Sequence, residues 1–325
     1  MKLRVAVIYG GRSGEHEVSV RSARSVLAAI DRSKYEVLEF FITPEGKWQP
    51  RPILPEPGAN PDIDVVFPVL HGTFGEDGTV QGLLELADLP YVGAGVLGSA
   101  AGMDKEVTKR LCRERGLPVV EFLVMRRGEL VPERVLDELG LPVFVKPANL
   151  GSSVGVSKVK NPAELLPALQ LAAQYDRKVI VERAVDAREI ECAVLGNECP
   201  EASLPCEIVP SREFYDYEDK YVLNQTQFRI PAELPTEQLE KVRRLAIAAY
   251  QAVECEGMAR VDFLLDRRSG ELFVNEVNTI PGFTEISMYP RMWEASGLSY
   301  PRLIDRLIEL ALERHQSKLQ TRYRR

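Results

Sequence analysis

The segment from Arg260 to Gly282 constrains the fold of this chain more than any other part of the sequence. Residues 259–265 and 271–277 alternate or run apolar in the manner of β-strands, and residues 266–270 between them have a turn-forming composition. The pattern predicts a tight antiparallel hairpin. Because side chains alternate between the two faces of a strand, four polar residues gather on one face, which we call the hairpin face. The hairpin face consists of Arg260, Asp262, Glu276 and Asn278.

The register predicted for this hairpin places Asp262 opposite Val274 and Arg260 opposite Glu276. A slip of one residue would break up the hairpin face. Aspartate, glutamate and asparagine supply the hard oxygen ligands that suit magnesium bound together with phosphate groups. The hairpin face is therefore either a metal-phosphate site or the charged outer face of an ordinary hairpin.

Length and composition indicate a multidomain protein without nucleic-acid or membrane chemistry. A chain of 325 residues exceeds the usual size of one hydrophobic core, which predicts two or three domains. The net charge of −7 gives no electrostatic reason to expect nucleic acid. The first residues resemble a strand and not a signal peptide, and the longest uncharged run, 89–103, is broken by proline and glycines. We therefore expect a cytoplasmic protein.

Strand-like and helix-like segments alternate along the chain, which predicts an α/β fold. In the first hundred residues the strands are expected at 3–11, 36–42 and 64–70, and the helices at 18–30 and 79–88. This order favours a parallel sheet. In the rest of the chain the strands are expected at 122–125, 142–147, 178–183 and 188–195, and the helices at 104–116, 162–175, 236–254 and from about 300. The five cysteines lack CxxC spacing, which indicates reduced core thiols and not a zinc site.

Residues 146–155 (KPANLGSSVG) connect a buried-looking strand to a second short strand. Gly151 and Gly155 allow close approach of the backbone, so the amides can bind phosphate oxygens, and Lys146 adds a positive charge. The residue order of a P-loop is absent, which excludes that fold. The segment is either a phosphate-binding flap or a flexible hairpin turn.

Two glycine-rich segments follow the first and third expected strands. Residues 10–17 lack the glycine spacing of a dinucleotide-binding loop, and Glu15 would repel a pyrophosphate there. Glu15 is better suited to hold an ammonium group, or else it only complements a helix dipole. Residues 71–79 precede a helix and could bind a small anionic group. His71 either lines such a site or is a structural histidine with satisfied hydrogen bonds.

Residues 215–221 are polar and aromatic without an apolar period, which predicts a loop able to close over a ligand. Its tyrosines and Lys220 are either surface residues or hydrogen-bond donors to a charged substrate. Glu182 and Glu189 flank an expected hinge at 185–188. There a strand edge could contact an adenine ring, and a carboxylate could contact the ribose attached to it.

Seven segments occur in the order typical of the D-alanine:D-alanine ligases, a family of the ATP-grasp superfamily, which this chain resembles over residues 8 to 290. They are GGRSGEHEVS, HGTFGEDGTVQGLLE, MDKEVTK, VFVKPANLGSSVGVSKV, FYDYEDKY, ARVDF and VNEVNTIPGFTEISM. The resemblance implies an ATP-grasp fold of three domains, with a Rossmann-like sheet first and ATP held between the second and third. We expect these domains at 1–103, 104–185 and 186–325.

The resemblance also implies a reaction in two steps, which makes D-alanyl-D-alanine for peptidoglycan precursors. The carboxylate of one D-alanine attacks the γ-phosphate of ATP, and the amine of a second D-alanine then displaces phosphate from the acyl phosphate. Two Mg²⁺ ions, replaceable by Mn²⁺, are implied as cofactors, and a homodimer as the assembly. No partner of another kind is expected.

The resemblance assigns functional roles to the residues of this sequence that match the family motifs. The resemblance assigns the metal ions to Asp262, Glu276 and Asn278. It assigns ATP to Lys105, Lys146, Gly151, Ser153, Val154, Gly155, Glu182, Arg183, Val185 and Glu189. Glu15 and His71 are implied for the first D-alanine, Ser287 and Met288 for the carboxylate of the second, and Arg260 with the Gly282 amide for the oxyanion. Ser152 and Tyr221 would join Glu15 in fastening the closing loop, with Lys220 nearby.

Two positions depart from the family pattern. Arg183 stands where lysine is expected before the hinge, which preserves the charge but leaves the adenine contact of that side chain open. Ala184 is smaller than the expected aromatic residue, so the adenine pocket is expected to be looser.

Four alternative functions differ from this interpretation in identifiable residues. A D-alanine:D-lactate ligase is disfavoured by Tyr221, because the ester-forming relatives tend to lack that tyrosine. Another carboxylate-amine ligase of the superfamily would not need Glu15, His71 and Tyr221 together. A non-catalytic nucleotide-binding regulator would be expected to have lost part of the hairpin face, which is complete here. A nicotinamide oxidoreductase is excluded by the missing glycine spacing after the first strand.

Overall fold

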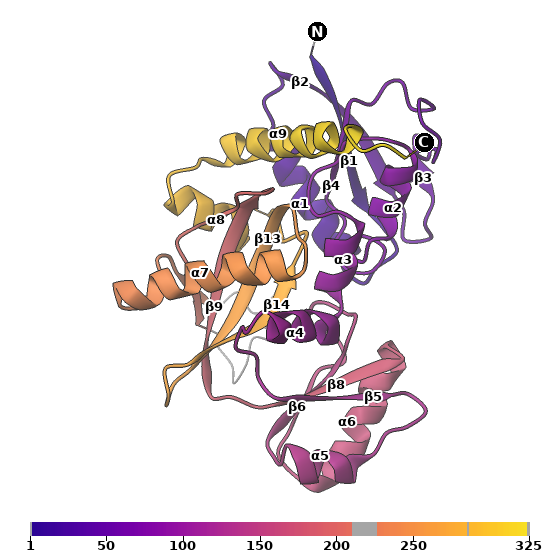
Figure 1. The fold of residues 1–325 in the computed structure, drawn as a ribbon. Helices are drawn as coiled ribbons and strands as arrows, with labels where there is room; N and C mark the ends of the chain where they lie inside the picture. Colours follow the sequence, from indigo (N-terminus) through magenta and orange to yellow (C-terminus); the bar gives the residue numbers. More distant parts are fainter. Residues whose placement is uncertain (1, 210–225, 285, 324–325) are drawn as a thin grey trace.

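A computed structural model describes residues 2–209, 226–284 and 286–323 of the protein. Within these residues, three β-sheets follow one another along the chain, and helices pack beside each of them (Figure 1). The lid segment 215–221, with Lys220 and Tyr221, lies outside the described residues.

The first sheet carries the two glycine-rich loops. Its strand order is β3-β2-β1-β4, and β1 pairs in parallel with both β2 and β4. Its strands are β1 (Leu3–Gly10), β2 (Tyr35–Ile42), β3 (Trp48–Gln49) and β4 (Val65–Pro68), with helices α1 (His16–Ala29), α2 (Thr79–Leu86) and α3 (Val96–Met103). The predicted parallel sheet is confirmed. Because β1 and β4 are parallel neighbours, the loops that hold Glu15 and His71 leave the same edge of the sheet.

The second sheet lies at the bottom of Figure 1 and is covered by two helices. Its order is β5-β8-β6-β7 with antiparallel pairing throughout. Its elements are β5 (Phe122–Arg126), α5 (Pro132–Glu138), β6 (Val143–Pro147), β7 (Ser157–Val159), α6 (Pro162–Tyr175) and β8 (Lys178–Arg183). A capping box of Asn161 and Glu164 begins α6 at the predicted place. The flap 146–155 connects β6 to β7, as the sequence predicts.

The third sheet provides the hairpin face. Its order is β12-β11-β9-β13-β14, and β10 also pairs with β9. The strands are β9 (Ala187–Gly196), β10 (Glu201–Ala202), β11 (Cys206–Val209), β12 (Gln227–Arg229), β13 (Gly257–Asp266) and β14 (Leu272–Asn278). Helices α4 (Lys105–Glu114) and α7 (Thr236–Ala252) contact β14. Asp104 caps α4 by accepting hydrogen bonds from the amides of Glu106 and Val107.

The predicted register of the β13–β14 hairpin is wrong, although the predicted face is right. Asp262 pairs with Glu276 and Arg260 with Asn278, whereas Phe263 pairs with Val274. The pairing shifts between Asp262 and Phe263, so one extra residue of β14 forms a bulge there. The offset from the predicted register is one residue beside the turn and two residues beyond the bulge. Because an offset of two restores the alternation, the hairpin face stays together.

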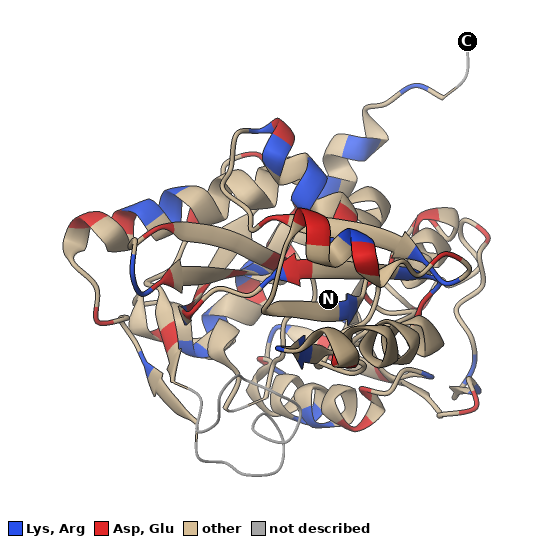
Figure 2. Cartoon of the chain, turned by 90° about the horizontal axis from the view of Figure 1, so that it is seen from below, with Lys and Arg blue, Asp and Glu red and all other residues tan. Residues whose placement is uncertain are grey.

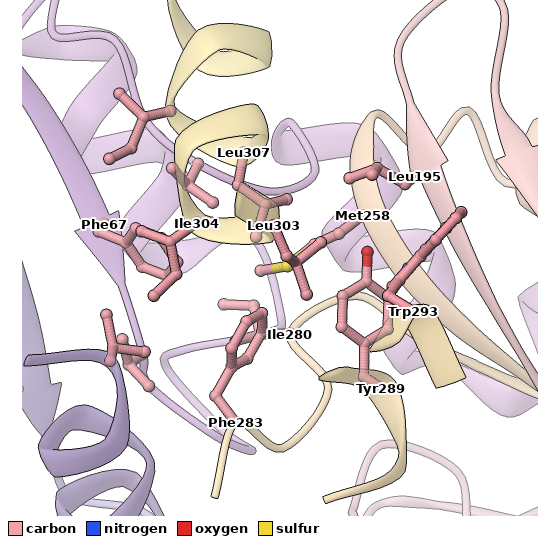
Figure 3. Close-up of a cluster of buried hydrophobic side chains, with 14 of the residues drawn as sticks. Phe67, Leu195, Met258, Ile280, Phe283, Tyr289, Trp293, Leu303, Ile304 and Leu307 are labelled. Carbon is pink, nitrogen blue, oxygen red and sulfur yellow. The ribbon is translucent and has the colours of Figure 1, made fainter. Parts of the chain in front are cut away.

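The C-terminal helices return to the first sheet. Helix α9 (Tyr300–Leu319) lies across β1 and β4, and α8 (Met288–Ala295) precedes it (Figure 1). Figure 3 shows Phe67 of β4 beside Ile304 of α9, and Phe283 lies in the same core cluster. The buried Asp305 accepts hydrogen bonds from the Tyr35 hydroxyl at 3.0 Å and from Lys34 Nζ at 2.6 Å. These contacts hold α9 against the first sheet.

The domain boundaries after residues 103 and 185 stay a prediction, because α9 joins the first sheet to the third within one core cluster. Basic and acidic residues are interspersed on the helices of the face seen in Figure 2. Of the helices in the described part of the chain, none is both long and apolar enough to cross a bilayer.

Candidate active site

Two cavities share a wall at the hairpin face. The larger has a volume of about 550 Å³, and the smaller, of about 140 Å³, lies between the second and third sheets. Among the residues predicted for the site, the larger cavity is lined by Glu15, His71, Lys105, Gly151, Ser152, Arg260, Glu276, Asn278, Gly282, Ser287 and Met288. The smaller cavity is lined by Lys105, Lys146, Gly151, Ser152, Ser153, Glu182, Arg183, Val185, Glu189, Arg260, Asp262 and Glu276. Five of the predicted residues therefore face both cavities.

Val154 and Gly155 of the flap line neither cavity, and their assignment to ATP stays a prediction. Gly155 has a φ of +70°, and a Cβ there would come within 3.0 Å of Pro147. Its glycine is therefore required by the turn itself and by its packing on β6.

The tip of the flap contacts the N-terminal loop. The Ser152 hydroxyl donates a hydrogen bond to Glu15 Oε1. Ser152 and Ser153 have φ values of 52° and 57°, in the left-handed region that non-glycine residues seldom occupy. A Cβ on Gly151 would come within 2.9 Å of Glu15 Oε2, so any other residue there would displace the Glu15 carboxylate. Flap and N-terminal loop thus meet on one side of the larger cavity.

His71 lines the larger cavity, but both of its ring nitrogens are engaged. Nδ1 lies 3.0 Å from the carbonyl oxygen of Ile280, and Nε2 lies 2.9 Å from Ser22 Oγ. Burial lowers the pKa of His71, but the neighbouring Glu76 and Glu15 carboxylates outweigh burial and raise it. His71 therefore fastens the loop after β4 to the loop after β14, which favours the structural interpretation left open by the sequence.

The hairpin face is a partly buried network of charges. Arg260 donates to both oxygens of Asp262, from Nε at 2.7 Å and from Nη2 at 2.6 Å. Asn278 Nδ2 donates to Asp262 at 3.0 Å. Arg260 Nε also lies 3.3 Å from Glu191 of β9. Burial raises the pKa of Asp262, Arg260 opposes it, and Glu191 and Glu276 raise it further, to about 7. Crowded carboxylates of this kind favour a bound cation.

Glu191 was not predicted as a site residue from the sequence, because its partners are distant in the chain. Glu191 pairs with Asp262 across β9 and β13, two strands that are about 70 residues apart in the chain. The alternation of charged and apolar residues in 188–192 was visible, but not the strand it would pair with.

Two lysine–glutamate pairs lie at the smaller cavity. Lys146 Nζ donates to Glu182 Oε2 at 2.7 Å, and Lys105 Nζ lies 3.7 Å from Glu276 Oε2. Burial raises the pKa of Glu182, but Lys109 and Lys146 outweigh burial and lower it to about 2. The Glu182 carboxylate is therefore held by two lysines. Arg183 forms an exposed ion pair with Glu121.

The start of α8 lines part of the larger cavity. Ser287 caps this helix, and its hydroxyl accepts a hydrogen bond from the Thr284 amide at 3.0 Å. A Cβ on Gly282 would lie 2.7 Å from Ser287 Oγ. Met288 is the first residue of α8, so its amide has no partner within the helix and is suited to bind an anion.

Known protein families match this chain over most of its length. The model of the D-ala D-ala ligase C-terminus matches residues 111–309, and that of the D-ala D-ala ligase N-terminus matches 4–60 and 54–94. The chain belongs to the D-alanine–D-alanine ligase family. This confirms the family resemblance that the sequence motifs indicate.

Members of the D-alanine–D-alanine ligase family are similar to this chain over nearly its full length. A D-alanine–D-alanine ligase from Solibacter usitatus is 65% identical over 325 residues, with 100% of both chains covered. One from Thermoanaerobacter sp. is 53% identical, with 98% of both chains covered. The solved D-alanine-D-alanine ligase from Coxiella burnetii is 40% identical with a TM-score of 0.88, over 98% of this chain and 96% of that one. The VanG D-Ala:D-Ser ligase from Enterococcus faecalis is 36% identical with a TM-score of 0.88, over 96% and 100%. The predicted α/β, ATP-grasp fold class is confirmed by this similarity.

Proposed function

We propose that this chain is an ATP-dependent ligase that joins two D-alanine molecules into D-alanyl-D-alanine and releases ADP and phosphate. The observation that carries the proposal is the shared wall of the two cavities. Arg260 and Glu276 face the larger cavity, which has room for two amino acids, and also the smaller one beside Lys146 and the flap. A phosphoryl group held at this wall would be in reach of substrates from both sides.

The hairpin face fits divalent metal ions by its chemistry. Asp262, Glu276 and the side-chain oxygen of Asn278 are hard oxygen donors on paired positions of β13 and β14. In the described ranges no three His, Cys, Asp or Glu residues cluster as a metal site, so substrate phosphates and waters would complete the coordination. We assign two Mg²⁺ ions, replaceable by Mn²⁺, to these residues. When bound, they would neutralise the charge on the phosphate oxygens.

The nucleotide would occupy the smaller cavity. Lys105, Lys146 and the amides of 151–154 would bind the phosphates, with Gly155 shaping the flap. Val185 and Glu189 would line the adenine and ribose pocket, with Glu182 and Arg183 contributing through the main chain.

The amino acids would occupy the larger cavity. Glu15 would hold the ammonium group of the first D-alanine, whose carboxylate oxygen forms a bond to the γ-phosphorus while ADP leaves. Ser287 Oγ and the Met288 amide would bind the carboxylate of the second D-alanine. Its neutral amine then attacks the acyl carbon, and phosphate leaves with its bond to carbon broken. Arg260 and the Gly282 amide would stabilise the oxyanion of that step.

The relatives suggest an alternative for one part of the proposed function, the identity of the second substrate, which we call the acceptor. A relative of similar fold is named a D-Ala:D-Ser ligase, and the sequence left a D-alanine:D-lactate ligase open. Greater overall identity to D-alanine–D-alanine ligases, and Tyr221, favour D-alanine. We further propose a cytoplasmic homodimer.

Phosphate release from Mg-ATP tests this function. The protein is given D-alanine, L-alanine, or D-alanine with D-serine or D-lactate, and the products are identified by mass. We expect release with D-alanine alone, and D-alanyl-D-alanine as the product. If a mixed peptide or an ester formed in preference to D-alanyl-D-alanine, the acceptor would be D-serine or D-lactate. If no substrate pair led to phosphate release, the proposal would be overturned.

A further inference from the structure

A buried lysine behind the smaller cavity has no role in the function proposed so far. Lys109 lies in α4, four residues after Lys105, so both side chains share a face of the helix. Lys105 lines both cavities, whereas Lys109 lines neither and is only 1% exposed. An ammonium group buried to this extent requires a compensating charge.

The compensating charge is Glu182 of β8. Lys109 Nζ lies 3.2 Å from Glu182 Oε1, and Lys146 Nζ lies 2.7 Å from Glu182 Oε2. Glu182 is 2% exposed, and each of its oxygens serves one lysine. Within the described residues, Glu182 is the only ion-pair partner recorded for Lys109. The three side chains form a row, Lys109–Glu182–Lys146, in which Glu182 and Lys146 line the nucleotide cavity and Lys109 lies behind them.

The charges of this row do not cancel. One carboxylate between two ammonium groups leaves one net positive charge. With Glu182 and Lys146 alone, the pair would be neutral, and the carboxylate would hold Lys146 away from a phosphate. Burial lowers the pKa of Lys109 below its usual value, and the ionised Glu182 beside it, which favours the charged form, offsets only part of that effect.

We propose that Lys109 is a positioning residue for ATP: it balances Glu182, so that Lys146 keeps its charge available to the nucleotide phosphates. The inference rests on the proposed function, since it assigns the smaller cavity to ATP. Lys109 touches no substrate and acts through Glu182. Because its effect is on charge, it concerns the phosphates and not the nucleoside.

The Lys109→Met variant tests this role, because methionine keeps much of the side-chain volume and removes the charge. Binding of Mg-ATP and of adenosine is measured by titration calorimetry for the full chain. We expect the Kd of Mg-ATP to rise about tenfold, while that of adenosine stays within about twofold. In turnover, KM for ATP should rise about tenfold with little change in kcat. Arg110→Met, an exposed position next in the same helix, is the matched control and should leave both Kd values unchanged.

A second substitution distinguishes charge from structure. In Lys109→Met with Glu182→Gln, the carboxylate that Lys109 balances is gone, so the affinity for Mg-ATP should return to within about threefold of the unaltered protein. Any one of three results would overturn this inference but not the proposed function. They are equal weakening of ATP and adenosine binding, unchanged ATP binding in Lys109→Met, and no recovery in the double variant. Failure of the unaltered protein to bind Mg-ATP would instead overturn the proposed function, and this inference with it.

Discussion

At the scale of single residues, side chains acquire their roles from partners that are distant in the sequence. The polar residues of the motifs could be predicted from the sequence, because residue type and spacing already suit phosphate and metal chemistry. Lys109 and Glu191 could not, because their partners, Glu182 and Arg260, lie about 70 residues away in the chain. For His71 the residue type was informative, but its contacts with Ser22 and Ile280, which favour the structural interpretation, could not be predicted from the sequence.

The contact between Ser152 and Glu15 predicts how the flap affects turnover. Ser152→Ala removes the hydroxyl that donates to the Glu15 carboxylate, a bond that closes the flap on the N-terminal loop. We expect kcat to fall about tenfold, because a hydrogen bond to a charged group contributes about 1.5 to 3 kcal/mol. The Kd of Mg-ATP should stay within about twofold. Ser33→Ala, at an exposed turn, is the control, and unchanged turnover in Ser152→Ala would contradict a role for the flap.

The close approach of Gly282 and Ser287 predicts a defect at the acceptor end. In Gly282→Ala the new methyl group would lie 2.7 Å from Ser287 Oγ, so the serine must move. We expect KM for the second D-alanine to rise at least about tenfold, and the affinity for ATP to be retained. Gly128→Ala is the matched control, since a Cβ there meets nothing within 4 Å. Substrate kinetics equal to those of the control would argue against this assignment.

At the scale of elements, the sequence predicts most strands and long helices, because their periodicity and capping residues are local. The parallel N-terminal sheet, α4, α6, α7 and the flap strands occur where they are expected. The short helices α3, α5 and α8 were not predicted from the sequence. The bulge in β14 could not be predicted either. It depends on the need to bury Val274 and Val277 while Glu276 faces Asp262.

The docking of α9 predicts a measurable loss of stability. Asp305→Ala removes the acceptor of the buried Tyr35 hydroxyl and leaves that hydroxyl without its partner. We expect the free energy of unfolding to fall by about 1 to 3 kcal/mol, the cost of an unsatisfied buried polar group. Urea unfolding measures this change. Glu309→Ala, an exposed position of the same helix, should change stability by less than about 0.5 kcal/mol, and equal effects would refute the role of Asp305 in docking.

At the scale of the whole molecule, three sheets contribute to the larger cavity, and two of them also form the wall that it shares with the smaller cavity. The flap comes from the second sheet, the hairpin face from the third, and Glu15 from the loop after β1 of the first. The sequence implied this assembly only through family resemblance, because no local pattern reports how α8 and α9 return to the first sheet. That return holds Phe283 beside α1, where its amide donates a hydrogen bond to Ser22 Oγ.

The most direct test of the account follows oxygen from substrate to product. D-alanine labelled with ¹⁸O in both carboxylate oxygens is converted with Mg-ATP, and the phosphate and the dipeptide are analysed by mass. Attack of the carboxylate on the γ-phosphorus predicts one ¹⁸O atom in each phosphate released with D-alanyl-D-alanine. Phosphate without ¹⁸O would contradict the acyl phosphate route and the joint use of the two cavities.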